Sequence, residues 1–515
     1  MSRRFNTAGP NDAEDHYTLP VLARLPDVRR FIDEKHYFIL HAPRQVGKTT
    51  ALLSLGRELT REGAYVAVLL SMEEGAPFSS DPGAAESAIL GSWRGRARAR
   101  LPLDLQPPPW PTAEPGSRVS VALQAWTEAA PRPLVLLLDE IDALQDEALL
   151  SVLRQLRAGF PDRPRHFPWS LVLIGLRDVR DYKIASGSGG RVGSSSPFNI
   201  KSESLTLRNF TREEIVDLYG QHTAETGQVF LPEAIDRAFY FTQGQPWLVN
   251  ALARQIVEVL VPDRAMAITV ADADAAKEIL IRRQDTHLDS LAERLREPRI
   301  RAILEPMLAG EPLGNMPDDD LRFAQDIGLV RMTAEGGLEV ANPIYREIIV
   351  RSLAATAQAS LPQIPTTWLT PDGRLDEERL LETFLAFWKQ HGEPLLGAAP
   401  YHEVAPHLVL MAFLHRVVNG GSIEREYAIG RGRMDLCLKH GRDTLAIEIK
   451  VWHPGRVDPL PEGLQQLDGY LAKLGLKSGW LVLFDRRPGL APIAERLATF
   501  DAITAGGRTV RVIRA

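Results

Sequence analysis

Cysteine is almost absent from the chain, which has Cys437 as its single thiol in 515 residues. An intrachain disulfide is therefore excluded, as is usual for proteins of a reducing compartment. The sequence also lacks an apolar run close to the roughly 20 residues that span a bilayer, and its start lacks the apolar core of a signal peptide. We expect a cytoplasmic protein with no membrane partner.

A strong excess of one charge is lacking too, because the formal net charge is −6. This value argues against a general polyanion-binding protein. From Gly397 onward, however, there are 16 Lys and Arg but only 12 Asp and Glu, a balance that favours phosphate contact. We therefore expect nucleic acid as a partner of the C-terminal part. With 44% hydrophobic and 24% charged residues, the chain has the composition of a globular protein with room for three or four domains.

Two runs of alternating apolar and polar residues near the C-terminus predict a β-hairpin. They cover residues 432–439 and 444–452, on either side of a turn at 441–442. Closing that turn pairs Lys439 with Thr444.

The same register places Asp435 opposite Glu448, with Lys450 on the same face because strand side chains alternate with period 2. Two opposed carboxylates repel each other unless a cation lies between them or one is protonated. Mg²⁺ prefers hard oxygen ligands, so Asp435, Glu448 and the Ile449 carbonyl are candidate metal ligands. Lys450 would orient the attacking water. The alternative is that these side chains form the solvent-exposed face of an amphipathic hairpin.

A helix-like segment after the hairpin carries Gln466 and Tyr470 in a Gln-x-x-x-Tyr spacing. Together with the hairpin, this pattern resembles the RecB-like branch of the PD-(D/E)XK nucleases over residues 400–515. The resemblance implies that Gln466 lies near the metal site and that Tyr470 faces the substrate backbone. That branch often has a His or Glu on the helix before the hairpin, for which His402 is the candidate metal ligand and Glu403 the alternative.

Near the N-terminus, an apolar run over 37–40 leads through a short loop into a helical pattern, which is the context of a phosphate-binding P-loop. Backbone N–H groups and the helix N-terminus would cradle the phosphates. Lys48 would reach the β- and γ-phosphates, and Thr49 would ligate Mg²⁺. Ala42 stands where the usual pattern has its first glycine, and its Cβ narrows the loop. The candidate nucleotide-binding residues are Arg44, Gln45, Val46, Gly47, Lys48, Thr49 and Thr50.

A second apolar run, 134–138, ends in Asp139 and Glu140. A continuous apolar run of this kind fits a central parallel strand covered on both faces. Asp139 would contact Mg²⁺ through water, and Glu140 would polarise the attacking water. A further strand-like run ends at Arg177, which would either sense the γ-phosphate or form a simple salt bridge. We therefore expect ATP and Mg²⁺ as cofactors.

Downstream, residues 242–250 contain Gly244-Gln-Pro246 within a helical stretch. With the P-loop, this pattern resembles the Gly-x-Pro motif of AAA/STAND-like ATPases of the archaeal type, in which the proline lies against the nucleotide in a helical lid. Pro246 is therefore a candidate nucleotide contact, and a turn that begins a helix is the alternative. The hairpin-like piece at 328–341 resembles a winged helix, whose acidic neighbour 317–320 favours a structural relay over DNA binding.

These patterns predict an α/β multidomain protein. A P-loop NTPase parallel sheet at 19–204 is followed by a helical lid at 205–285 and a winged-helix-like domain at 286–356. A linker at 357–376 precedes a restriction-endonuclease-like α/β domain at 377–515.

The two resemblances together imply an ATP-regulated, Mg²⁺-dependent nuclease that cleaves phosphodiester bonds, with DNA as the expected substrate. They also imply a role in defence against foreign DNA, and they are compatible with homo-oligomerisation on ATP binding and with a protein trigger. The alternative function is a STAND-like switch whose output is nucleotide-dependent signalling or oligomerisation. Its C-terminal domain would then be a docking module.

Overall fold

The computed structural model divides the chain into two compact units, Met1–Ser290 with Met316–Tyr345, and Leu291–Asn315 with Arg346–Ala515. The predicted 286–356 domain thus has residues in both units. Among the helices of the part that is described, none combines the length and apolarity needed to cross a bilayer. The structure describes residues 3–176, 204–283, 294–295, 297–309, 313, 316–333, 336–349, 368–398, 410, 413–414, 422–429 and 432–515.

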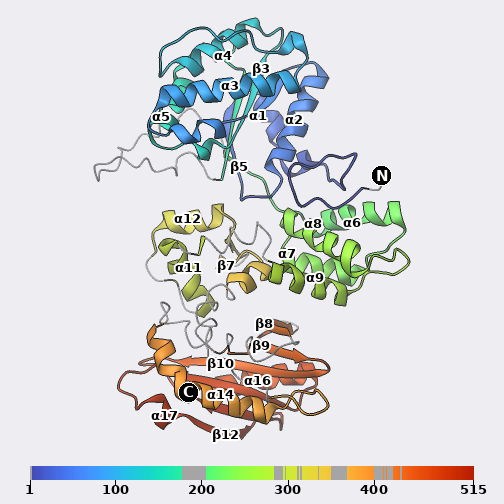
Figure 1. Ribbon diagram of the computed structural model, residues 1–515, viewed down its shortest axis with the longest axis vertical. Coiled ribbons are helices and arrows are strands. Elements are labelled where there is room, and N and C mark those ends of the chain that lie inside the picture. The colour runs from blue at the N-terminus through green and yellow to red at the C-terminus, as the bar shows by residue number, and fades with distance from the viewer. Residues whose placement is uncertain are drawn as a thin grey trace. The chain divides into compact units, whose positions relative to one another are not determined.

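The first unit is built on a five-stranded sheet in the order β2-β3-β4-β1-β5, in which all neighbouring strands are parallel (Figure 1). Every residue of β2, β3 and β4 is buried, as strands covered on both faces require. The strands are β1 (Tyr37–His41), β2 (Val66–Ser71), β3 (Leu134–Asp139), β4 (Ser170–Gly175) and β5 (Ser204–Thr206). The predicted parallel sheet is therefore confirmed.

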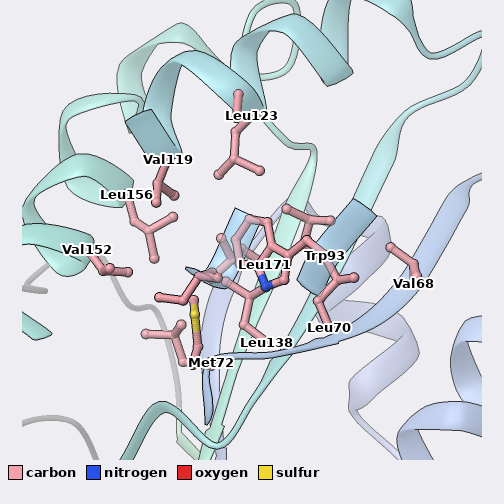
Figure 2. Packing of buried hydrophobic residues seen from close by; sticks show 14 of the residues in the cluster. Val68, Leu70, Met72, Trp93, Val119, Leu123, Leu138, Val152, Leu156 and Leu171 are labelled. Carbon is pink, nitrogen blue, oxygen red and sulfur yellow. The ribbon is translucent and has the colours of Figure 1, made fainter. Parts of the chain in front are cut away.

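Helices cover both faces of this sheet, and each face has its own apolar core. Trp93 is fully buried in one core (Figure 2), and its indole N–H donates to the Ser71 carbonyl at 2.9 Å. That face is covered by α3 (Pro82–Arg100), α4 (Arg118–Ala129) and α5 (Asp146–Ala158), and the other by α1 (Val28–Asp33) and α2 (Lys48–Glu62). Short 3₁₀ turns lie at Val21–Arg24, Glu73–Phe78, Leu103–Leu105, Ile141–Ala143 and Phe160–Asp162.

A group of helices follows the sheet over the range predicted as a lid, and this group is called the lid below. Thr211 and Glu214 make a complete capping box at the start of its first helix. Its helices are α6 (Arg212–Thr226), α7 (Pro232–Thr242), α8 (Pro246–Gln255) with the π-helical turn Ile256–Leu260, and α9 (Val270–Arg283). The same unit includes α12 (Asp318–Asp326) and an antiparallel hairpin of β6 (Val330–Met332) and β7 (Leu338–Val340), which confirms the hairpin predicted at 328–341.

The N-terminal segment before residue 19 is also part of the first unit. Phe5 and Tyr17 are buried, and the Phe5 ring contacts Tyr17 at 4.8 Å and Tyr219 at 5.6 Å between centroids. The Tyr17 hydroxyl lies 3.2 Å from Nδ1 of His222 in α6. The segment therefore packs on the lid, although it lies outside the domain predicted to begin at residue 19.

The second unit is built on a six-stranded mixed sheet in the order β12-β13-β11-β10-β9-β8. The antiparallel run β8-β9-β10 is joined through β10 to the parallel strands β11 and β13, and β12 pairs antiparallel at the edge. The strands are β8 (Ser422–Ile429), β9 (Gly432–His440), β10 (Asp443–Trp452), β11 (Ser478–Asp485), β12 (Ala498–Ile503) and β13 (Thr509–Arg514). The helices are α11 (Pro298–Ala309), α14 (Glu377–Ala398), α16 (Leu460–Leu474) and α17 (Ile493–Arg496).

Both faces of this second sheet are covered. Leu467 and Leu471 of α16 pack on Cys437 and Ala446 at one face. At the other, Trp388 of α14 contacts the Phe484 ring at 5.0 Å between centroids. Because α16 lies across the face that carries Glu448, part of this face is buried in an apolar core. It therefore differs from a purely solvent-exposed polar face.

Candidate functional site

The loop between β1 and α2 has the backbone that a phosphate cradle needs. Gln45 and Gly47 have φ values of +60° and +91°, which turn the chain sharply into the first residue of α2. The first N–H groups of α2 are free of intrahelical partners, so this end of the helix favours an anion. A cavity of about 600 Å³ opens here, and Arg44, Gln45, Val46, Gly47, Lys48, Thr49 and Thr50 all line it.

Lys48 is held inside the loop by backbone oxygens. Its ammonium donates to the carbonyls of Ala42 at 2.5 Å and Pro43 at 2.8 Å. Burial lowers the pKa of Lys48 to about 8, although the nearby Asp139 and Asp142 oppose this shift. The lysine thus presents a poorly solvated positive charge at the cavity wall, which a phosphate would stabilise.

The acidic end of β3 meets the first turn of α2. The Thr49 hydroxyl donates to Oδ2 of Asp139 at 3.1 Å, and burial raises the pKa of Asp139. A hydroxyl and a carboxylate oxygen this close are hard ligands of the kind that Mg²⁺ takes, so the pair fits that ion. Glu140 follows with φ +60° and accepts a 2.7 Å hydrogen bond from the Ser71 hydroxyl. Repulsion by Glu140 raises the pKa of Glu73, which also lines the cavity.

The Gly-Gln-Pro segment joins the lid to this cavity. Pro246 begins α8 and lines the cavity, and the side chain of Gln245 caps the helix by accepting from the Leu248 N–H at 2.6 Å. Gly244 has φ +72°, and a Cβ there would overlap the Phe210 carbonyl, so the position requires glycine. The motif is therefore both a helix start and a cavity wall. Arg177, the predicted sensor, lies outside the described residues.

Thr50 differs from its neighbours in what it contacts. Its hydroxyl accepts a hydrogen bond from the backbone N–H of Asn11 at 3.1 Å. The residue therefore ties the N-terminal segment to the P-loop helix, a contact that the sequence analysis did not anticipate.

Arg24 is a second residue that the sequence analysis missed. Its guanidinium is buried and donates to the carbonyls of Val46 at 3.1 Å and Arg208 at 2.9 Å, and it lies 4.8 Å from the Phe210 ring centroid. Burial lowers the pKa of Arg24 to about 10. It thus connects the P-loop to the start of the lid. No local motif marks it, because its two carbonyl partners lie 22 and 184 residues away in the sequence.

A second polar cluster lies between β10 and α16 in the C-terminal unit. Nζ of Lys450 lies 3.1 Å from Oε1 of Glu448 and donates to Oε1 of Gln466 at 2.6 Å. Glu448 is only 2% exposed. The structure therefore brings together three of the predicted residues. Glu462, which was not predicted, accepts from Nε2 of Gln466 at 3.2 Å, and its i, i+4 spacing from Gln466 was the available signal.

The hairpin register follows the prediction as far as the paired residues extend. Thr444 pairs with Lys439 and Ile447 with Leu436 around a turn in which Gly441 has φ +59°. Asp435 is the next residue of β9 beyond Leu436, and its side chain lies outside the part that the structure describes.

Of the other predicted residues, Tyr470 packs on apolar side chains, and the His402 position is not described. The Tyr470 ring packs against the apolar cluster under α16. His402 and its alternative Glu403 lie outside the described residues. Among the side chains that are described, no group of three or more His, Cys, Asp or Glu could hold a metal. In the β10-α16 cluster, the buried Glu448 carboxylate is the described oxygen donor that fits Mg²⁺.

No protein-family model matches the chain, and no curated protein matches its sequence. Among solved structures, the Walker-type ATPase of Pyrococcus abyssi is 14% identical, with a TM-score of 0.47 over 67% of this chain and 99% of the other. The RuvB Holliday junction branch migration motor of Thermotoga maritima is 16% identical, with a TM-score of 0.35 over 63% and 92% of the two chains. Cdc6p from Pyrobaculum aerophilum is 12% identical, with a TM-score of 0.34 over 64% and 92%.

These likenesses are too partial to assign an activity to this chain. The strand order, the parallel pairing and the loop between β1 and α2 are by themselves the architecture of a P-loop NTPase. The C-terminal unit has a separate mixed sheet.

Proposed function

We propose that the protein is an ATP-regulated, Mg²⁺-dependent nuclease, with ATP bound in the first unit and phosphodiester cleavage at the β10-α16 cluster. The nucleotide part of the proposal rests on the cavity, which is lined by residues 44–50 of the P-loop together with Asp139 and Glu140. The contacts of Lys450 with Glu448 and Gln466 support the nuclease part.

In the first unit, the positive end of α2 and the Lys48 ammonium bind the phosphate chain. On nucleotide binding, Lys48 exchanges its two carbonyl contacts for phosphate oxygens, whose negative charge offsets the burial that lowers its pKa. Thr49 and Asp139 would hold Mg²⁺, which neutralises charge on the phosphate oxygens when it is bound. Glu140, held by Ser71, orients the attacking water.

In the second unit, Lys450 is the residue that positions water. Its ammonium is shared between Glu448 and Gln466, so its direction is fixed from both β10 and α16. Glu448, with Asp435 as its predicted partner across the hairpin, would hold Mg²⁺. Gln466 in turn is fixed by Glu462.

DNA is the proposed substrate, and defence against foreign DNA is the proposed setting. The basic balance after residue 397 supports a polyanionic substrate. We further propose that ATP binding drives homo-oligomerisation and that a protein trigger acts through the first unit.

Cleavage of a panel of single-stranded, duplex and circular DNA with Mg²⁺, with and without ATP, tests the proposal. We expect wild-type protein to cut in the presence of ATP. Lys48→Ala should lose the ATP effect, and Lys450→Ala should lose cleavage while it still binds ATP. Equal cleavage by wild type and Lys450→Ala would overturn the nuclease part, and a wild-type protein that binds no ATP would overturn the nucleotide part.

One contact favours a second candidate function, the nucleotide-dependent switch. Gly328, just after α12, lies against Pro43 of the P-loop, where an added Cβ would be 2.8 Å from the proline ring. Asp326 lies 4.0 Å from Nδ1 of His41 at the end of β1. Lys48 donates to the Pro43 carbonyl, so a movement of Lys48 on nucleotide binding would take place next to the segment that leads into the β6-β7 hairpin.

Size-exclusion chromatography of wild type and Glu140→Gln with ATP distinguishes the two candidates. An ATP-dependent assembly that cleaves none of the DNA panel supports the switch, and ATP-dependent cleavage supports the nuclease.

A further inference from the structure

The carboxyl ends of three parallel strands meet at one edge of the C-terminal sheet, next to the β10-α16 cluster. Trp452 ends β10 and pairs with Asp485 at the end of β11, and Leu483 of β11 pairs with Arg514 at the end of β13. In open α/β sheets, ligands bind outside this end of the strands. The proposed cleavage at Lys450 uses one strand of this edge and leaves the other two without a role.

Trp452 lies on the same face of β10 as the cluster. Side chains alternate along a strand, so Glu448, Lys450 and Trp452 share one face, and about 7 Å of strand separates each from the next. Ala446, which belongs to the same series, packs in the apolar core under α16. Trp452 is the last residue of the strand and is only half-buried. Its ring therefore continues the surface that begins at Lys450.

Arg487 is held against the Trp452 ring. Its guanidinium carbon lies 3.5 Å from the ring centroid, and its Nε and Nη2 donate to the Asp485 carboxylate at 2.9 and 2.6 Å. The described hydrogen bonds of this side chain use Nε and Nη2 and leave Nη1 available, and 37% of the side chain is exposed. Arg487 thus presents a charged group in a fixed plane, which suits the oxygens of a phosphate.

Trp452 also shapes the loop between β10 and α16. Its indole N–H donates to the Arg456 carbonyl at 2.9 Å, and the Arg456 N–H donates to the His453 carbonyl at 3.2 Å. Gly455, with φ +73°, allows this turn. The Arg456 side chain is exposed. One tryptophan therefore joins the two loops that carry Arg456 and Arg487.

The charge of this edge is positive. Residues 452–459 and 485–487 together with Arg514 contain four arginines and two aspartates, a formal balance of +2. Arg514 donates to Asp458 at 2.6 Å and lies 5.6 Å from the Trp452 ring centroid. The aspartates thus orient arginines without cancelling the positive charge of the edge, which favours a polyanion.

We infer that Arg487, stacked on Trp452, binds a backbone phosphate of the DNA strand whose phosphodiester lies at Lys450. Arg456 adds positive charge from the neighbouring loop. The contact recognises charge rather than base edges, so it is independent of base sequence. This inference rests on the proposed nuclease function, and it names the residues that hold the substrate beyond the reacting phosphate.

Salt-dependent binding of a short fluorescein-labelled DNA duplex tests the contact. The parent is full-length Glu448→Gln protein with Mg²⁺ and ATP, which should bind the duplex while cleavage is slow. Arg487→Gln keeps most of the side-chain length and an amide that can donate to Asp485, but it removes the charge. By fluorescence anisotropy, we expect affinity to fall about 5- to 10-fold at about 0.1 M salt. The slope of log K against log salt should become shallower by about 0.9, the value for one phosphate.

Arg511→Gln is the matched control. Arg511 lies on the opposite face of the same sheet, because its neighbours in β13 pack under α16, and it also pairs with carboxylates, those of Glu378 and Asp501. Its affinity and slope should equal those of the parent.

Trp452→Leu provides a second test that leaves the charge of Arg487 in place. It removes the ring that fixes the guanidinium, so affinity should fall about 2- to 5-fold. Thermal unfolding checks that each variant is folded. A folded Trp452→Leu protein with the affinity of the parent would overturn the role of the ring.

The outcomes separate the phosphate contact from the proposed function. If the parent binds DNA and Arg487→Gln has the slope of Arg511→Gln, the contact is wrong and the nuclease function stands. If Arg487→Gln lowers the slope but wild type cuts no DNA, the contact stands and the nuclease function fails. If wild type neither binds nor cuts DNA, both fail.

Discussion

The two candidate sites hold their lysines in opposite ways. Lys48 in the first unit donates to two backbone carbonyls, and burial lowers its pKa to about 8. Lys450 in the second unit lies 3.1 Å from the Glu448 carboxylate and donates to a side-chain amide. Among the described residues, no carboxylate lies within ion-pair distance of the Lys48 ammonium, whereas Glu448 lies within that distance of Lys450.

This difference indicates two kinds of chemistry. A lysine that only neutral carbonyls hold gains most when a phosphate replaces them, so its site is suited to binding an anion. A lysine that a carboxylate and an amide hold on two sides is fixed in direction, so its site is suited to orienting a small molecule such as water. The predictions that follow test this contrast, beginning with the largest effect.

Replacing each lysine by methionine should affect only its own site. Lys48→Met should weaken ATP binding by about 100-fold or more, since it removes the charge that reaches the phosphates. Lys450→Met is the matched control, and its ATP affinity by calorimetry should equal that of wild type. A Lys48→Met protein that binds ATP with wild-type affinity would show that Lys48 does not bind the phosphates, and the contrast between the two lysines would fail.

Gly244, two residues before the cavity-lining Pro246, should be a sensitive backbone position of the lid. Gly244→Ala places a Cβ against the Phe210 carbonyl at a positive φ, so we expect the first unit to lose about 3 kcal/mol of unfolding free energy. Urea unfolding measures this loss. The control Gly91→Ala, at an open position in α3, should gain about 0.5 to 1 kcal/mol. If Gly244→Ala loses only a little unfolding free energy, the lid can adopt another backbone conformation at this turn.

ATP binding should take up a proton above about pH 8, and this follows from the lowered pKa of Lys48. Below pH 8 the free ammonium is already charged, so the affinity should be independent of this group. Above pH 8 the free lysine is increasingly neutral and phosphate contact raises its pKa, so the dissociation constant should rise by up to about tenfold per pH unit. Calorimetry at pH 8.5 in two buffers of different ionisation enthalpy measures the uptake, and Lys48→Met should lack it.

The same linkage affects stability with a definite sign. The pKa of Lys48 is lowered from its usual value of 10.5, so the folded state releases this proton at lower pH than the unfolded state. The cost of burying the charge is therefore fully present below about pH 8 and is relieved as the pH rises from 8 towards 10.5.

Glu462 should have the smallest effect. Its carboxylate is exposed and lies 3.7 Å from Nζ of Lys450, so the ion pair is screened by water. Glu462→Gln should change the cleavage rate less than about fivefold, whereas loss of the buried Glu448 carboxylate should abolish cleavage. A rate that falls as far in Glu462→Gln as in Glu448→Gln would give the two carboxylates equal roles.

Local patterns were sufficient for much of the fold. The apolar run before Lys48, the run that ends at Asp139, the Thr211 capping box and the pairing of Thr444 with Lys439 each depend on neighbouring residues or on one short turn. Such features are set by periodicity and turn chemistry, which one sequence displays directly.

The rest of the nucleotide cavity depends on contacts between distant residues. Arg24 bonds a carbonyl 184 residues away, and Trp247 bonds one 240 residues away. No local pattern predicts such pairs. The Asn, Gly and Pro residues of segment 6–11 are typical of turns, but they give no indication that this segment lines the nucleotide cavity. In the C-terminal unit, alternation alone did not show that α16 covers the Glu448 face.

The most direct test of the account is Mg²⁺-dependent cleavage of DNA by the Glu448→Gln protein with saturating ATP. The change keeps the shape of the buried side chain and removes its charge, and it leaves the nucleotide cavity untouched. The account predicts ATP affinity equal to wild type and cleavage reduced by about 100-fold or more. Glu448→Gln protein that cuts DNA as fast as wild type would contradict it.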